Sequence, residues 1–384
     1  MKKIGSLNSL VIGLLLVSVV GIGIVYFAES PNGTEFQRDN AAQDITSFTE
    51  YSRGTVVEIL EEQQDDVMQS SSLYQRLKIE VTKGPDKGSF IETEFTQLQD
   101  SSGSARYKAG DSVVLGLLLD EYVVVDRYRL NHLYLVVALF VALAILIGRK
   151  KGLLSIIGLI VTGVIVVMFV APQLLAGKDP VSVSVLAAGL IAVVTMTISH
   201  GFSVRTRLSI ISTLASLLLA TILSVVFVYT TQLFGLGQSD AFILESGFLG
   251  GINLRGILLA GIIISLLGVL DDVTTTQTAT VSELSLADPS MSFGKLFRAG
   301  MVVGREHIAS LINTLILVYA GASLPLFLLL TAATAQPLWV LINSEYLAEE
   351  IVRAVVGSIA LILAVPISTV LASYWYGNKT DKTK

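Results

Sequence analysis

The sequence predicts a membrane all-α helical bundle of about eight transmembrane helices, with a small extracytoplasmic all-β domain inserted after the first helix. Three observations predict this fold: eight apolar runs, Lys and Arg placed in alternate connections between them, and a polar β-rich segment over residues 28–130. With 52% hydrophobic and 15% charged residues, the chain is too apolar for an ordinary soluble protein. The lipid bilayer is therefore its expected partner.

The apolar runs are each roughly 17–25 residues long, enough for a helix rising about 1.5 Å per residue to cross a hydrocarbon layer about 30 Å thick. They cover residues 7–27, 131–148, 152–170, 181–199, 208–231, 254–270, 308–330 and 353–375. We interpret residues 1–28 as an uncleaved signal anchor, because the run is long and lacks a small-x-small cleavage site at its exit. Residues 131–376 then form a seven-helix domain, and residues 377–384 form a tail.

The positions of Lys and Arg predict the orientation of the chain. Basic residues precede the first run, separate the second from the third, the fourth from the fifth and the sixth from the seventh, and follow the eighth. The alternate connections are poorer in them, and residues 331–352 contain no Lys or Arg. Because short loops rich in Lys and Arg stay in the cytoplasm, we expect both termini inside and residues 29–130 outside.

Residues 29–130 are predicted to hold a linker followed by a β-module. Short β-rich runs are separated by turn segments rich in Gly, Pro, Asp and Ser. The runs cover residues 53–60, 74–82, 89–95, 112–118 and 121–127. Five short strands suit a closed or partly open barrel of the OB type, because closure removes exposed sheet edges.

Composition excludes several function classes. Residues 28–130 contain 19 acidic and 10 basic residues, and their strands lack a basic groove with interleaved aromatic residues, so nucleic acid is not an expected partner. The absence of Cys excludes disulfides, thiol catalysis and Cys-ligated metal centres. No nucleophile elbow, zinc-protease motif or phosphate-binding loop is present, so we expect neither an enzyme nor an ATP-driven machine, and no cofactor beyond an unidentified bound cation.

One polar segment directly follows the sixth apolar run. Its candidate ion- or substrate-binding residues are Asp271, Asp272, Thr274, Thr275, Thr276, Gln277 and Glu283. If the helix persists, Asp271, Thr275, Thr278 and Ser282 form one stripe, and Asp272, Thr276 and Glu283 form a second. Carboxylates at the C-terminal end of a helix lie near its partial negative charge, so a cation or a proton is expected beside them. Exposure to water at the cytoplasmic boundary is the alternative explanation.

Further candidates lie on the same predicted cytoplasmic face. Arg305 is expected to act as the charge partner of the two aspartates, and Asn313 lies about two turns deeper in the seventh run. Secondary candidates are His200, Glu306 and His307, which would add titrating groups. A lone His at a membrane boundary is more often a capping residue, and the metal, if there is one, is not identified by these residues.

The polar segment resembles a known family signature. The run 268–277 (GVLDDVTTTQ), followed by Glu283-Leu284, is similar to the signature of the YibE/YibF family of bacterial multi-pass membrane proteins. Residues 313–315 with 319–325, and residues 198–201, resemble two further blocks, so that the resemblance covers residues 131–375. The anchor and the β-module look like those of the longer, YibE-type member. The resemblance implies location in the bacterial plasma membrane, and either a YibF-type hetero-partner or a homo-oligomer.

Neither the residues nor the resemblance names a substrate. The leading hypothesis is an ATP-independent transporter or permease subunit with a cation- or proton-linked acidic site at the cytoplasmic end of the sixth helix. The alternative is a non-catalytic membrane scaffold or assembly protein whose external β-module binds an envelope partner. An intramembrane aspartyl enzyme is disfavoured, because adjacent acids on one helix point about 100° apart.

Overall fold

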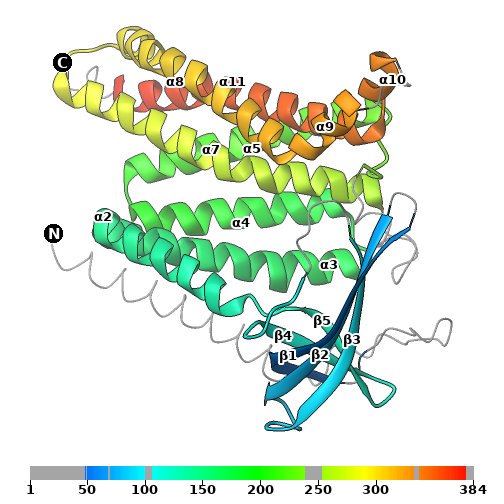
Figure 1. Ribbon diagram of the computed structural model, residues 1–384. Helices are drawn as coiled ribbons and strands as arrows, with labels where there is room; N and C mark the ends of the chain where they lie inside the picture. Colours follow the sequence, from blue (N-terminus) through cyan, green and yellow to red (C-terminus); the bar gives the residue numbers. More distant parts are fainter. Residues whose placement is uncertain are drawn as a thin grey trace. The chain divides into compact units, whose positions relative to one another are not determined.

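The computed structural model describes residue 48 and residues 50–67, 70–99, 106–237, 253–332 and 337–377 (Figure 1). By its internal contacts the chain divides into two compact units, with the boundary between Leu143 and Ala144. One unit holds a β-sheet and the start of a helix, and the other holds the remaining helices, so each is described by itself. The predicted signal anchor and the predicted tail beyond Gly377 lie outside the described residues.

The first unit contains one antiparallel sheet of five strands, as the sequence predicts. The strands are β1 (Glu50–Val67), β2 (Ser70–Lys83), β3 (Phe90–Gln99), β4 (Ser112–Leu118) and β5 (Glu121–Arg127), in the spatial order β3-β2-β1-β4-β5. Alternate residues such as Leu77, Ile79 and Val81 point to one buried face, where they form a core with Val113 and Leu115. The two-residue turn between β4 and β5 has positive φ at both Leu119 and Asp120, as a type I′ turn requires.

The predicted OB-type barrel is a half-barrel. Strand β1 pairs with β2 over nearly its whole length, but with β4 only through its first six residues. Because β4 and β5 have seven residues each, they cannot cover the far ends of β2 and β3. Within the described residues, the end strands β3 and β5 are joined by a side-chain hydrogen bond from the Thr93 hydroxyl to the Tyr122 carbonyl at 2.7 Å. The sheet therefore curls, but no ladder of backbone hydrogen bonds joins the described residues of β3 and β5, so the barrel is not closed.

The second unit consists of helices that follow the predicted apolar runs. Helix α2 (Leu130–Ile165) continues through a π-helical turn, η1 (Val166–Val170), into α3 (Ala171–Leu175). The other helices are α4 (Pro180–His200), α5 (Val204–Thr230), α7 (Leu254–Ala287), α8 (Phe293–Ala322), α9 (Leu324–Ala332), α10 (Leu338–Ile342) and α11 (Glu345–Gly377). Polar side chains cap three starts, since Asp179, Ser203 and Asn253 each accept a backbone N–H from the first turn of α4, α5 or α7.

The described residues contain six candidate membrane helices, so the prediction of eight is wrong. The first predicted run, 7–27, lies outside the described residues. The predicted second and third spans belong to one continuous 46-residue candidate, Leu130–Leu175, which changes direction at Arg149 (φ 51°, ψ −130°). Only three residues separate the two apolar runs, too few for an ordered loop, so a single non-helical residue makes the break. The absence of a side chain at Gly152 permits it to approach the carbonyl of Ala144.

Helix α7 is the central helix of this unit. It packs against α4, α5, α8 and α11, which Figure 1 shows grouped around it. In its most apolar 18-residue window 56% of the residues are buried, against 11% in α8. Its inward face carries large apolar side chains such as Ile263, Leu266 and Leu270, which belong to the main core. Any polar residue of α7 is therefore close to several other helices.

Helix α7 also extends beyond its predicted end. The apolar run stops at Leu270, but the helix continues to Ala287 and has 34 residues, about 51 Å at 1.5 Å per residue. Asp271 and Asp272 are its 18th and 19th residues. The prediction that the acidic pair lies at the end of the sixth helix is therefore wrong. The helix dipole, which acts only within the terminal turns, does not decide what these carboxylates need.

Candidate functional site

The polar segment of α7 is divided between a buried face and an exposed face. Thr274, Gln277, Thr278 and Ser282 are buried. Asp271 and Thr275 are half-buried at the border, and Asp272, Thr276 and Glu283 are exposed. Both predicted stripes therefore exist as helical faces, but only the second lies wholly on one surface.

The buried members connect α7 to its neighbours. The hydroxyls of Thr213 on α5 and Thr274 lie 2.5 Å apart. The Gln277 amide nitrogen donates to the Gly300 carbonyl of α8 at 2.9 Å and to the Thr369 hydroxyl of α11 at 2.8 Å. Because these donors are satisfied within the bundle, Thr274 and Gln277 hold helices together and are not available to a ligand.

The Asp271 carboxylate has little compensation. Its hydrogen-bond donor is the Thr275 hydroxyl, at a long 3.5 Å from Oδ1. No ion pair among the described residues includes Asp271, Asp272 or the predicted partner Arg305. A half-buried carboxylate without a cationic neighbour is costly in an apolar bundle, and a proton or a small cation relieves that cost.

The exposed face of α7 carries small and polar residues over much of its length. Over its first 23 residues the exposed positions of α7 form one stripe, which consists of Gly261, Ser265, Gly268, Asp272 and Thr276. A Cβ added at Gly261 or Gly268 would meet nothing within 4 Å, so the stripe borders open space. We call these five residues the α7 stripe.

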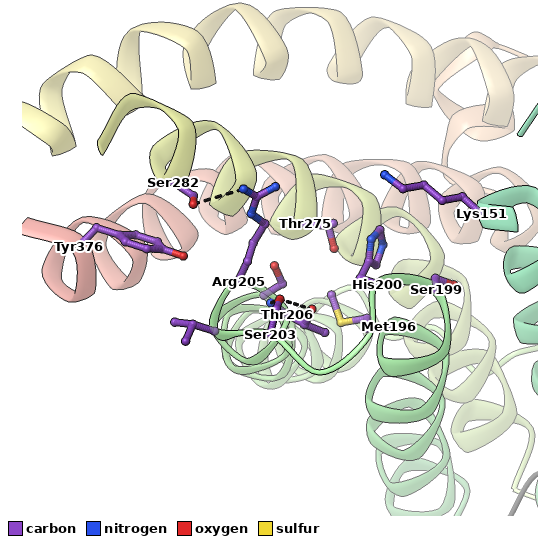
Figure 2. A pocket seen from close by; sticks show the side chains of 12 residues that line it. Lys151, Met196, Ser199, His200, Ser203, Arg205, Thr206, Thr275, Ser282 and Tyr376 are labelled. Carbon is purple, nitrogen blue, oxygen red and sulfur yellow. Dashed lines mark hydrogen bonds between the residues drawn. The ribbon is translucent and has the colours of Figure 1, made fainter. Parts of the chain in front are cut away.

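A polar cavity of about 390 Å³ lies where α4 ends and α5 begins (Figure 2). Its lining comes from five helices, α2, α4, α5, α7 and α11. The lining residues are Lys151, Met196, Ser199, His200, Ser203, Val204, Arg205, Thr206, Ser209, Thr275, Ser282 and Tyr376. We call it the His200 pocket. Because Thr275 also donates to Asp271, the pocket ends one helical turn from that carboxylate.

Arg205 anchors one side of the His200 pocket. Its guanidinium forms an ion pair with Glu283 at 2.6 Å and lies 3.4 Å from the Ser282 hydroxyl (Figure 2). Glu283 is 12 residues beyond Asp271, about 18 Å along the helix, so these two predicted site residues do not meet. The basic residue that pairs with the predicted acidic segment is thus Arg205, which forms its ion pair with Glu283, and not the predicted Arg305.

The remaining predicted residues are spread over α8. Arg305, Glu306 and Asn313 are exposed and His307 is half-buried. Only His200, a secondary candidate, lines the pocket together with Thr275. Sequence reasoning treated Arg205 as an orientation signal and did not select Lys151 or Ser209. The repeated hydroxyl residues in the first half of α5 were the available signal for that polar surface.

Acidic and His side chains do not form a metal centre in the part of the chain that the structure describes. There, no group of three or more His, Asp or Glu side chains is placed to hold a metal ion.

Comparison with known protein families identifies one family that the chain matches. The model of the YibE/F-like protein family matches residues 136–378, which is more than half of the chain. The chain belongs to this family. The match includes all of α7 and every residue of the His200 pocket, so both features lie in the family region of this YibE/F-like protein. No curated protein and no solved structure matches it. With its six candidate spans, this YibE/F-like protein is a multi-pass membrane protein.

Proposed function

We propose that this YibE/F-like protein is an ATP-independent transporter or permease subunit, in which Asp271 takes up a proton or a cation. The observation that carries the proposal is the composition of the α7 stripe. A helix face toward lipid is expected to be apolar. The exposed positions of α5 fit that rule with Ile211, Leu218 and Ile222, whereas the α7 stripe has two glycines, two hydroxyl residues and an acid.

A polar stripe on a central helix fits a water-filled passage. Carboxylates at membrane depth line cavities or ion paths, because exposure of a charge to lipid is costly. Asp272 lies in the stripe, and Asp271 lies beside it at the border of the buried face. The His200 pocket reaches the same turn of α7 through Thr275. A proton taken up from the passage would therefore meet Asp271 at the border of the buried face.

The proposal assigns different roles to the predicted residues. Asp271 is the titrating group, and Thr275 is a hydrogen-bond donor to it. Asp272 and Thr276 provide polar surface to the passage, while Glu283 and Arg205 form a fixed ion pair at its mouth. Protonation removes the desolvation cost of Asp271, so uptake of a proton and a change in helix packing are coupled.

The absence of Cys makes a direct test simple, since a single introduced thiol is the only one in the chain. Ser265→Cys and Thr276→Cys probe the α7 stripe, and Leu218→Cys on α5 is the matched apolar control. Thiol reagents that carry a charge need a thiolate in water, so we expect the stripe variants to react about tenfold faster or more. Labelling is measured on the full chain in native membranes.

Two results would count against the passage. Labelling of Thr276→Cys that is no faster than that of Leu218→Cys would mean that the stripe is dry. Efficient disulfide formation between two copies through Ser265→Cys would mean that small residues of the stripe pack against a second chain.

A second candidate function, a scaffold that binds an envelope component, is favoured by one observation in the first unit. A cavity of about 580 Å³ there has a basic and aromatic lining, which includes Arg53, Lys83, Arg127, Tyr51 and Tyr128. The Arg53 guanidinium lies 3.8 Å from the ring centroid of Tyr128. Basic and aromatic side chains together suit an anionic, partly apolar partner.

A further inference from the structure

The lining of the His200 pocket has the wrong charge for a cation site. Lys151 and Arg205 contribute positive charge to it, no Asp or Glu is among its lining residues, and Arg205 is paired with Glu283. We propose that the His200 pocket binds a phosphate-type oxyanion. This ligand is different from the proton or cation proposed for Asp271.

Charge is the first argument. Lys151 has no ion-pair partner among the described residues, and the guanidinium of Arg205 has donors beyond the one that Glu283 accepts from. Figure 2 shows the Lys151 side chain extending toward the His200 ring from another helix. The pocket therefore has an excess of positive charge without a built-in counterion, and an anion would neutralise it.

The start of α5 is the second argument. This helix has 27 residues, and its first turn forms part of the pocket wall. Ser203 caps it by accepting the Thr206 N–H at 3.0 Å. The N–H groups of Val204 and Arg205 have no acceptor within the helix, because the first turn of a helix has none. Such N–H groups, with the positive end of the helix dipole, bind anions.

Ser209 is the third argument and is independent of the helix start. Its side chain is 1% exposed and lines the pocket, and Oγ has no hydrogen-bond partner. The nearby Ser212 differs, since its hydroxyl donates to the Leu208 carbonyl at 2.8 Å. The Ser216 hydroxyl is also unpartnered but lies outside the pocket, so it is the position of Ser209 in the lining that makes its hydroxyl available to a bound anion.

The arrangement of the donors selects the class of anion. Donors approach from three helices, with an ammonium on α2, an imidazole on α4, and N–H groups and the Ser209 hydroxyl on α5. A carboxylate has two oxygens in one plane, whereas a phosphate has three or four oxygens that point in different directions. The volume exceeds that of a bare phosphate, so a phosphate monoester or a lipid headgroup also fits.

The test measures binding of radiolabelled inorganic phosphate to the purified full chain at equilibrium. Lys151→Gln removes the unpaired ammonium, and we expect it to weaken binding about tenfold or more, because hydrogen bonds to charged groups are strong. Lys150→Gln, at the exposed neighbour, is its control. Ser209→Ala should weaken binding by about threefold to tenfold. Its control is Ser216→Ala, a buried serine that also has an unpartnered hydroxyl but lies outside the pocket.

A second arm distinguishes a free anion from a lipid headgroup. The chain is placed in nanodiscs of phosphatidylglycerol or of phosphatidylcholine, and thermal unfolding is followed in each. Stabilisation by phosphatidylglycerol that disappears in Lys151→Gln supports the site with a lipid as the source, and saturable phosphate binding supports it with a free anion. Absence of both, or an equal loss in the control variants, would overturn the proposal.

The anion site is close to the residue that we propose for proton or cation uptake. An anion in the His200 pocket would lie about one helical turn from Asp271, so that the two sites together would describe a proton-linked anion carrier. That last step rests on the proposed function. Phosphate binding is measured without transport, so the two proposals can fail separately. If the chain binds phosphate but the α7 stripe is not accessible to water, the anion site is supported and the transporter function is contradicted.

Discussion

At the scale of single residues, burial decides what Asp271 needs. It is half-buried in the middle of α7, and its carboxylate accepts one hydrogen bond within the described residues, from Thr275. Neither a basic residue nor a second strong donor compensates the charge in the described part of the chain. A carboxylate in this position is more stable when a proton or a cation is present, and that dependence is what a coupled transporter uses.

Asp271→Asn is therefore expected to abolish function without affecting folding. The amide keeps the size and one oxygen of the side chain, but it cannot take up a proton. In a strain that lacks the gene, we expect no complementation by the variant, because an amide cannot take up a proton. The level in the membrane, measured by immunoblot, should be unchanged.

The control is Asp120→Asn, which makes the same chemical change in an exposed turn with φ 67°, a conformation that Asn tolerates. Full complementation by Asp271→Asn would contradict an ion site at Asp271. An equal defect in both variants would indicate that the substitutions lower the amount of protein in the membrane.

At the scale of elements, α8 approaches the bundle through two glycines four residues apart. A Cβ at Gly300 would come within 2.9 Å of Thr369 and Val281, and one at Gly304 would come 2.5 Å from Val365 and 3.0 Å from Gln277. Their lack of side chains lets α8 lie close enough for the Gly300 carbonyl to accept from Gln277. This contact matters because little of α8 is buried elsewhere.

Gly304→Ala tests this contact against Gly321→Ala in the same helix. At Gly321 a Cβ would meet nothing within 4 Å, so the change should be neutral or slightly favourable through helix propensity. At Gly304 the added methyl overpacks the contact, and we expect destabilisation by about 1–3 kcal/mol. Thermal unfolding of the purified chain measures the difference. Equal melting temperatures would mean that α8 is not held through Gly304.

At the scale of the whole molecule, the two units have separate cores. The half-barrel core contains residues such as Leu77 and Leu115, and the helical core contains residues such as Leu266 and Leu361. Neither core cluster includes buried residues of the other unit. Each unit therefore has the apolar burial that a domain needs for its own stability.

Deletion of residues 51–128 tests whether the two units are independently stable. We expect the helical unit to reach the membrane and to unfold at about the same temperature, within about 0.5 kcal/mol of stability, because no core contact is lost. If the scaffold function is correct, the same deletion removes crosslinks to an envelope component in living cells. Unimpaired crosslinking would contradict that function, and failure of the truncated chain to accumulate would contradict the independence of the units.

Much of the fold follows from local signals. The apolar runs predicted the positions of α4, α5 and α11, and alternation with turn residues predicted β4 and β5 with the bounds that the structure has. These predictions of helices and strands succeed because hydropathy and the spacing of apolar residues reflect the surroundings of one segment at a time. The site was predicted less well. The family signature located α7, whereas the predicted partner Arg305 is exposed on another helix.

By itself, the sequence determined that the chain spans a membrane, that a β-module lies outside the helical region, and that residues 271–283 are unusual. Only the tertiary structure decided that α7 continues through that segment, because Thr274 and Gln277 find partners on α5, α8 and α11. It also decided that Lys151, His200 and Ser209 share one pocket. The physical reason is that hydropathy is additive along a chain, whereas satisfaction of buried polar groups depends on which helices meet.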